Sequence, residues 1–222
     1  MKIEITREEL SALLRKQLDH LFLLRKGPEE QHLEVCIDKA LSKTEHCFKH
    51  SSNKYYKLAE ETYFNPFHSG QYCVFLYFLS HAIFQSDPAH RSLADRVYFL
   101  NKTLNAIDLF YEIELPDVFS LDHPVGTVLG RAKYGNYFSF SQNCTIGNNR
   151  GIYPTIGRNV KLLSGAKLIG NSTIGDNVTL SANTYVKDTD IPSCSIAFGS
   201  SPNLIIKSKD QSYFNPRFSS TK

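Results

Sequence analysis

The sequence predicts an α+β protein, in which a helical first half is followed by a parallel β-solenoid of triangular cross-section. In the first half, apolar residues recur at the spacing of amphipathic helices. From Ile156 onward an aliphatic residue returns every six positions, a period that fits neither an α-helix nor a half-buried strand. The second half is also rich in Gly, Asn, Thr and Val, which disfavour a long helix.

Several start signals define the expected helices of the first half. Thr6 followed by Glu9 has the spacing of a capping box, and leucines at helical spacing come after it. A second helix is expected to start after Pro28. Residues 70–84 are apolar nearly all round, which predicts a buried helix. Asp87 before a proline fits the N-cap of a fourth helix.

The six-residue period of the second half is sustained over many steps. The aliphatic positions are Ile156, Leu162, Leu168, Ile174, Leu180 and Val186. Four residues after the first five of these come small or β-branched residues: Val160, Ala166, Ser172, Val178 and Thr184. Stepping back by six from Ile146 gives bulkier apolar residues: Phe140, Tyr134 and Val128. The series through Ile146 and the series through Ile156 are offset by four residues, which predicts a loop inserted between these two residues.

Short flat strands satisfy this period. Each hexapeptide forms one side of a triangular prism, with the aliphatic residue pointing inward and a small residue near the corner. Stacked coils then pair backbone to backbone and bury a continuous apolar column.

Composition limits the class of protein. The chain has 222 residues, 41% of them hydrophobic, and a net charge of +3 without a basic run, so nothing indicates nucleic-acid binding. The longest apolar stretch, residues 73–84, is too short to span a bilayer, and acidic residues stand where a signal peptide would be apolar. Five cysteines without a C-x-x-C pair suit a reducing compartment. We therefore expect a soluble cytoplasmic protein without a membrane span.

The repeat resembles that of the hexapeptide-repeat acyltransferases, and the segment LDHPVGTVLGRA, residues 121–132, resembles the motif of serine acetyltransferases. The resemblance implies a left-handed parallel β-helix that forms homotrimers or dimers of trimers. It also implies transfer of an acetyl group from acetyl-CoA to the hydroxyl of a small-molecule acceptor. The domains expected are a helical domain over 1–115, the β-helix over 116–207, and an extended or mobile tail over 208–222.

The same resemblance assigns roles to acidic residues around a histidine. His123 would be the catalytic general base, since a neutral imidazole can take the acceptor proton at neutral pH. Asp108 would fix its tautomer, although Glu112 and Glu114 lie close enough in sequence to orient the ring instead. Asp122 would help to hold the acceptor.

Coenzyme A in this family lies along a prism edge, against backbone amides and small side chains. The corresponding positions are Gly147, Ser164, Gly165 and Ala182, with Lys207 as a phosphate partner. Corners of the fold need small residues in any case. No metal is expected, because His46 and His50, four apart on a predicted helix, lack an evident third ligand.

The chain departs from the resemblance on the acceptor side. Serine acetyltransferases place an Arg-His pair before the proline of the inserted loop, where this chain has Ile152 and Tyr153, and its nearest arginine is Arg150. Tyr55 replaces an aspartate that binds the amino group of serine. The acceptor therefore stays open between serine and a sugar of a surface-glycan precursor. Neutral groups suited to a sugar are available on Tyr153, Asn65, His68 and Gln71. A non-catalytic trimeric scaffold is the alternative from another class.

Overall fold

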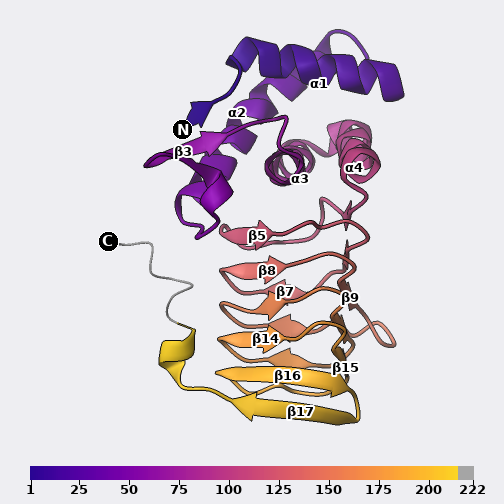
Figure 1. Cartoon of the computed structure of the whole chain (residues 1–222). Helices are drawn as coiled ribbons and strands as arrows, with labels where there is room; N and C mark the ends of the chain where they lie inside the picture. The colour runs from indigo at the N-terminus through magenta and orange to yellow at the C-terminus, as the bar shows by residue number, and fades with distance from the viewer. Residues whose placement is uncertain (215–222) are drawn as a thin grey trace. The chain divides into compact units, whose positions relative to one another are not determined.

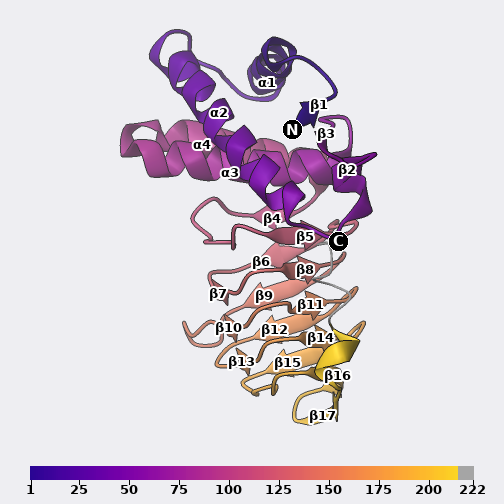
Figure 2. The same cartoon turned by 90° about the vertical axis from the view of Figure 1, so that its left-hand side faces the viewer.

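A computed structural model describes residues 1–214 of the chain, which form two compact units. The helical unit comprises residues 1–49 and 53–112, and the solenoid unit comprises residues 50–52 and 113–214 (Figures 1 and 2). The helices of the first unit are α1 (Arg7–Leu21), α2 (Pro28–Lys49), α3 (Ser69–Ser86) and α4 (Arg91–Asn105), with short 3-10 helices η1 (Lys54–Tyr56) and η2 (Pro88–His90). Its strands are β1 (Lys2–Ile3), β2 (Lys57–Leu58), β3 (Glu61–Phe64) and β4 (Asp108–Leu109). Among the described residues, no helix is both long enough and apolar enough to cross a bilayer.

The helices form where the sequence predicts them. Thr6 caps α1 by accepting a bond from the Glu9 N–H at 3.1 Å, and the Glu9 carboxylate accepts from the Thr6 N–H at 2.8 Å. The helix α2 begins at Pro28, and α3 is buried over most of its circumference. Asp87, predicted as the N-cap of the fourth helix, instead caps the short η2, and α4 begins after it at Arg91.

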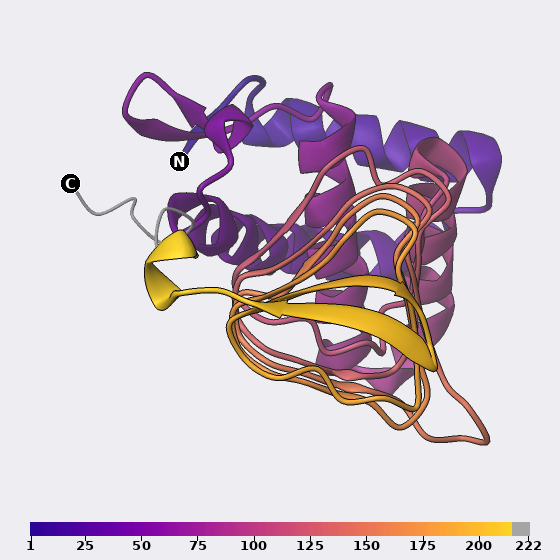
Figure 3. The same ribbon diagram turned by 60° about the horizontal axis from the view of Figure 1, so that its bottom comes forward.

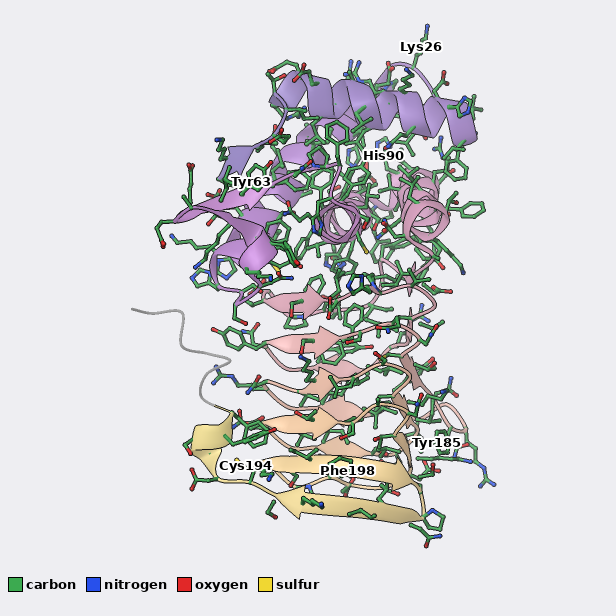
Figure 4. The ribbon with its side chains drawn as sticks, viewed as in Figure 1. Lys26, Tyr63, His90, Tyr185, Cys194 and Phe198 are labelled. Carbon is green, nitrogen blue, oxygen red and sulfur yellow. The ribbon has the colours of Figure 1, made fainter. Side chains whose placement is uncertain are left out.

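A small sheet in the helical unit was not predicted. Its strand order is β1-β3-β2, with β1 parallel and β2 antiparallel to β3. The Tyr63 hydroxyl, labelled in Figure 4, donates to the Glu4 carboxylate and ties the start of the chain to β3. Strands of two residues carry little periodicity, so sequence patterns alone do not reveal them.

A charge network joins α1 to α2. The Glu34 carboxylate accepts hydrogen bonds from Ser11, from Arg15 and from Arg7, the last at 2.8 Å. Desolvation alone would raise the pKa of Glu34, but these donors outweigh it and lower the pKa to about 2. The ionised carboxylate is therefore the form that the folded state favours.

The solenoid unit has three faces of parallel strands. Face A contains β7 (Lys133–Tyr134), β10 (Thr155–Ile156) and β13 (Thr173–Ile174). Face B contains β5 (Phe119–Leu121), β8 (Phe138–Phe140), β11 (Lys161–Leu162), β14 (Val178–Leu180) and the first part of β16 (Ser195–Ser200). Face C contains β6 (Val128–Leu129), β9 (Thr145–Gly147), β12 (Lys167–Ile169) and β15 (Tyr185–Lys187). Seen end on, these coils make a triangle (Figure 3), as expected for a left-handed parallel β-helix.

The six-residue period corresponds to the buried column of the prism. The six aliphatic positions from Ile156 to Val186 are all at most 3% exposed. The small and β-branched positions four residues further on, such as Ala166 and Thr184, are buried as well. Each hexapeptide therefore contributes both an aliphatic side chain and a small neighbour to the core.

The corners have a left-handed backbone in coil after coil. At corner AB, between faces A and B, positive φ recurs at Tyr137, Asn159, Asn177 and Cys194. At corner BC it recurs at Gly126, Asn143, Gly165 and Asn183. Gly and Asn tolerate this conformation better than other residues, which explains their abundance in the second half. Corner CA, between faces C and A, shows the same conformation at Gly170 and Asp188.

One predicted register position is wrong. Val128 was predicted to point inward, but it is 43% exposed, and Leu129 is buried and pairs in register with Ile146. The cause is a short corner, because only five positions separate Leu129 from its face A successor Tyr134, whereas Leu168 and Ile174 are six apart. Counting back from Tyr134 in a step of six therefore arrives one residue too early, at Val128 instead of Leu129.

The predicted insertion and the end of the chain complete the unit. Residues 148–153 form a hairpin at corner CA, which stands off the triangle in Figure 3. The last strand, β17 (Asn203–Ser208), pairs antiparallel with β16 and leads to the 3-10 helix η3 (Gln211–Tyr213) and the buried Phe214. The rest of the predicted tail, residues 215–222, lies outside the described residues.

We expect Glu34→Gln to destabilise the protein by about 1 kcal/mol at pH 7, the size of a partly exposed ion-pair network. Because the pKa of Glu34 is lowered in the folded state, the wild-type advantage is present above pH 4.5 and is lost as pH falls toward about 2. Urea unfolding of the wild type and the variant between pH 7 and pH 2.5 measures this difference in the free energy of unfolding. A stability gap that stays constant down to pH 2.5 would contradict the assignment.

The corrected register predicts different costs for two neighbouring truncations. Leu129→Ala removes a core side chain and is expected to cost about 2–5 kcal/mol. Val128→Ala, at an exposed position, is expected to cost about 0.5 kcal/mol or less. Chemical denaturation compares the two, and a larger loss for Val128→Ala would restore the original register.

Candidate active site

The candidate histidine stands in an enlarged turn at corner BC. From Leu121 to Val128 the chain takes seven positions, whereas the paired segment of the next coil, from Phe140 to Thr145, takes five. Two extra residues therefore bulge out of this corner. His123 lies in the bulge with a left-handed backbone, φ 48°.

The enlarged turn is fastened to the next coil. The Asp122 N–H donates to the Phe140 carbonyl at 3.0 Å, and the Val125 carbonyl accepts from the Asn143 N–H at 2.9 Å. The buried Thr127 hydroxyl donates to the Ser141 carbonyl at 2.8 Å. The backbone of the bulge is thus held at both ends while its tip faces outward.

The imidazole of His123 is accessible. Its side chain is 87% exposed, and that of Asp122 is 76% exposed. The Nε2 atom of His123 lies 3.6 Å from Oδ1 of Asp122, which is beyond hydrogen-bond distance. Within the solenoid unit the ring is therefore open to an incoming reactant and only loosely paired with its neighbour.

Asp108 belongs to the helical unit, where both carboxylate oxygens have partners. Its Oδ1 accepts from the Tyr98 hydroxyl at 2.7 Å, and its Oδ2 accepts from the Lys102 ammonium at 2.7 Å. The hydrogen bond to Asp108 raises the pKa of Lys102. The carboxylate is therefore oriented and charge-compensated.

Glu112, the alternative orienting group, is itself engaged by a cation. Its Oε1 accepts a hydrogen bond from Arg91 at 2.9 Å. Glu114 also has interactions with its surroundings and falls in the solenoid unit. The three carboxylates thus remain alternatives as partners of His123.

Three of the predicted coenzyme A positions share corner BC with His123. Ser164 and Gly165 follow β11, and Ala182 occupies the equivalent place one coil further on, since the Asn183 N–H donates to the Ser164 carbonyl at 2.9 Å. A Cβ on Gly165 would lie 2.3 Å from Oδ1 of Asn183, so this position excludes larger side chains. The corner therefore presents a column of small residues.

The remaining two cofactor candidates lie elsewhere on the solenoid. Gly147 is at the far end of β9, where a Cβ would meet Ile169 at 3.1 Å. Lys207 is on β17, and its ammonium lies 5.5 Å from the ring centroid of Phe198 on β16, which Figure 4 labels. Gly147 and the corner BC residues are therefore at opposite edges of face C.

Arg150 and Tyr153 lie in the inserted hairpin at corner CA. Arg150 is exposed at its tip, with φ 51°. The Tyr153 hydroxyl accepts a hydrogen bond from Asn148 Nδ2 at 3.3 Å. Both acceptor candidates thus belong to a different corner of the prism from His123.

Of the neutral groups suggested for a sugar, Tyr153 belongs to the solenoid unit, whereas Asn65, His68 and Gln71 belong to the helical unit. The Gln71 amide is used internally, with its oxygen accepting from the Asn65 N–H and its nitrogen donating to the Tyr55 carbonyl, both at 2.6 Å. Gln71 therefore holds the loop before α3 together. Tyr55 is 55% exposed beside the His68 ring, at a centroid distance of 5.6 Å.

No group of three His, Cys, Asp or Glu side chains within residues 1–214 is arranged to hold a metal ion. His46 and His50 both interact with other residues.

Comparison with known proteins agrees with this architecture. Residues 153–188 match the family described as bacterial transferase hexapeptide (six repeats). A serine acetyltransferase of Staphylococcus xylosus is 32% identical over 139 residues, which cover 57% of this chain and 63% of the relative. This chain is a hexapeptide-repeat protein that resembles serine acetyltransferase. The matched part spans less than two thirds of that relative's length.

Solved structures show the same fold for this hexapeptide-repeat chain. The serine acetyltransferase of Neisseria gonorrhoeae superposes with a TM-score of 0.65 at 17% identity, covering 95% of this chain and 90% of that one. A serine acetyltransferase solved in complex with CoA has a TM-score of 0.57 at 17% identity, covering 88% and 75%. At these identities the likeness is one of fold.

Sequence reasoning missed the enlarged turn and the support of the hairpin. A signal for the turn was present, because Leu121 and Leu129 are eight positions apart where the period requires six. The corresponding signal for the hairpin is the spacing of Gly170 and Asp188, which are eighteen residues, or one coil, apart. Both residues lie beneath the hairpin.

Proposed function

We propose that this protein is an acetyl-CoA-dependent O-acetyltransferase of the serine acetyltransferase type. The observation that carries the proposal is an exposed histidine in an enlarged corner, above a column of small residues that can accept an extended cofactor. The similarity to serine acetyltransferases, one of them solved with CoA, supports acetyl-CoA as the donor.

The reaction requires from the protein a general base and an edge that binds the coenzyme. The neutral imidazole of His123 takes the proton of the acceptor hydroxyl as its oxygen attacks the thioester carbonyl. The carbon–sulfur bond then breaks, and the imidazolium returns the proton to the departing thiolate. Ser164, Gly165 and Ala182 would lie along the coenzyme, with Gly147 and Lys207 as further contacts. No metal is required for these steps.

The separation of the candidate residues supports assembly into homotrimers. His123 lies at corner BC and the hairpin with Arg150 and Tyr153 at corner CA, so one solenoid does not bring them together. In a trimer of prisms, corner BC of one copy would face corner CA of the next, and each cleft would contain one base and one hairpin. A dimer of trimers through the helical units would leave this arrangement unchanged.

L-serine is the acceptor that the similarity favours, and Asp122 would help to hold it. A sugar hydroxyl is the second candidate, favoured by the neutral Tyr153 in the hairpin and by the exposed Tyr55 beside His68. A non-catalytic scaffold would share the solenoid but would bind no acetyl-CoA.

Release of free thiol from acetyl-CoA, measured with serine and with a panel of sugars and sugar nucleotides, tests the proposal. His123→Ala is expected to reduce kcat by about 10²- to 10⁴-fold, the usual contribution of a general base. His20→Ala, at an exposed histidine of α1, is the matched control and is expected to leave turnover unchanged. If no acceptor is acetylated and acetyl-CoA does not bind, the protein is a scaffold.

The group that orients His123 is open to a separate test. If Asp108 fixes the ring, Asp108→Asn should lower kcat by at least about tenfold with little change in KM, because an incorrect tautomer weakens the base without removing it. Glu112→Gln and Glu114→Gln serve as comparisons. A greater loss in either of these would assign the role to that glutamate.

A further inference from the structure

The hairpin at corner CA presents its tip in an unfavourable conformation. Arg150 and Gly151 both have positive φ, 51° and 80°, as the two central residues of a type I′ turn do. Asn149 and Ile152 flank them and exchange two backbone hydrogen bonds of 3.0 Å. Glycine accepts this geometry readily, but arginine at the first position does so at a cost. The surrounding structure must therefore hold the turn in place.

A carboxylate two coils further on supplies that support. Asn149 Nδ2 donates to Asp188 Oδ2 at 2.6 Å. The other oxygen of Asp188 accepts from the Asn171 N–H at 2.8 Å, and the Asp188 N–H donates to the Ile169 carbonyl at 3.1 Å. Asp188 is thus fixed to the solenoid through its backbone and one oxygen, and uses the other oxygen for the hairpin.

Gly170 makes room for this contact. A Cβ at this position would lie 2.1 Å from Asp188 Oδ1 and 2.7 Å from the Cβ of Asn149. The absence of a side chain therefore lets the hairpin rest directly on the corner of the coil that follows it.

The second leg of the hairpin is braced from within. Asn148 Oδ1 accepts from the Gly151 N–H at 3.1 Å, and its Nδ2 donates to the Tyr153 hydroxyl at 3.3 Å. One polar side chain thus ties the turn to Tyr153, while Asn149 ties it to the solenoid. Movement of the Asn149 anchor would therefore displace both Arg150 and Tyr153.

We infer that Asp188 is a positioning residue for acceptor binding, which acts through Asn149 to set where the hairpin presents Arg150 and Tyr153. The inference rests on the proposed function, because it assumes that the hairpin contacts the acceptor. Asp190, two residues further on, offers a contrast. Among residues 1–214, its carboxylate accepts only from the solenoid backbone, at the Thr173 N–H, 2.6 Å away.

An exchange of the amide and the carboxylate tests this contact. Asn149→Asp places two carboxylates together and is expected to raise the KM for the acceptor about three- to tenfold, the usual worth of one hydrogen bond, with the KM for acetyl-CoA unchanged. In the double variant Asn149→Asp/Asp188→Asn, the new amide at position 188 can donate to the new carboxylate at position 149, while its oxygen still accepts from Asn171. The acceptor KM is expected to return to the wild-type value.

Asn149→Asp/Asp190→Asn is the matched control, since it has the same net charge but leaves the two carboxylates at positions 149 and 188 opposed. It is expected to stay as impaired as Asn149→Asp. Rescue by both double variants would reduce the effect to net charge and overturn the inference. An unchanged acceptor KM in Asn149→Asp would overturn it as well.

Hydrogen exchange of the amides at positions 149 and 152 provides a readout independent of activity. These amides should exchange faster in Asn149→Asp and return to wild-type rates only in the double variant that also carries Asp188→Asn. If the wild-type protein acetylates no acceptor, the proposed function fails, while the exchange rates still decide whether Asp188 holds the hairpin. Equal exchange in all variants would refute that anchoring.

Discussion

The turn at each corner of the prism is the constraint on which the rest of the solenoid depends. Strands of two or three residues can pair with the coils above and below only if the chain bends sharply at the same place in every coil. The bend is made by residues with positive φ, which recur in columns such as Asn143, Gly165 and Asn183. The buried aliphatic column follows from this regularity, because fixed corners place every sixth side chain on the prism axis.

Departures from the regular corner coincide with the candidate chemistry. Corner BC gains two residues once and there exposes His123. Corner CA gains four residues once, since Ile146 and Ile156 are ten positions apart, and there carries Arg150. His123 and Arg150 both stand where the repeat is interrupted, one in the enlarged corner and the other in the inserted hairpin. The regular coils provide the rigid support that such interruptions need.

The sequence predicted the features that repeat and missed those that occur once. Helix starts at Thr6 and Pro28, the buried α3 and the aliphatic column were predictable because each rests on periodicity or on a local capping rule. The inward position of Leu129 was not predictable, because a corner shortened by one residue shows in the sequence only as a one-residue shift of the repeat. His123 was proposed as the base from its motif alone. Its exposure and the support of the hairpin by Asp188 depend on contacts between coils, which a linear pattern does not contain.

The reversal of the final strand also decides where the stack stops. A parallel coil ends in an edge that a second solenoid could extend, and head-to-tail stacking of that kind does not close into a ring. Here β17 turns back along β16, so the last edge runs against the direction of the coils. Its outward residues include the exposed Ile205 and Ile206, followed by Lys207 and Lys209. A strand of opposite polarity followed by cations is a poor template for another coil, so this hairpin disfavours extension of the stack at that end.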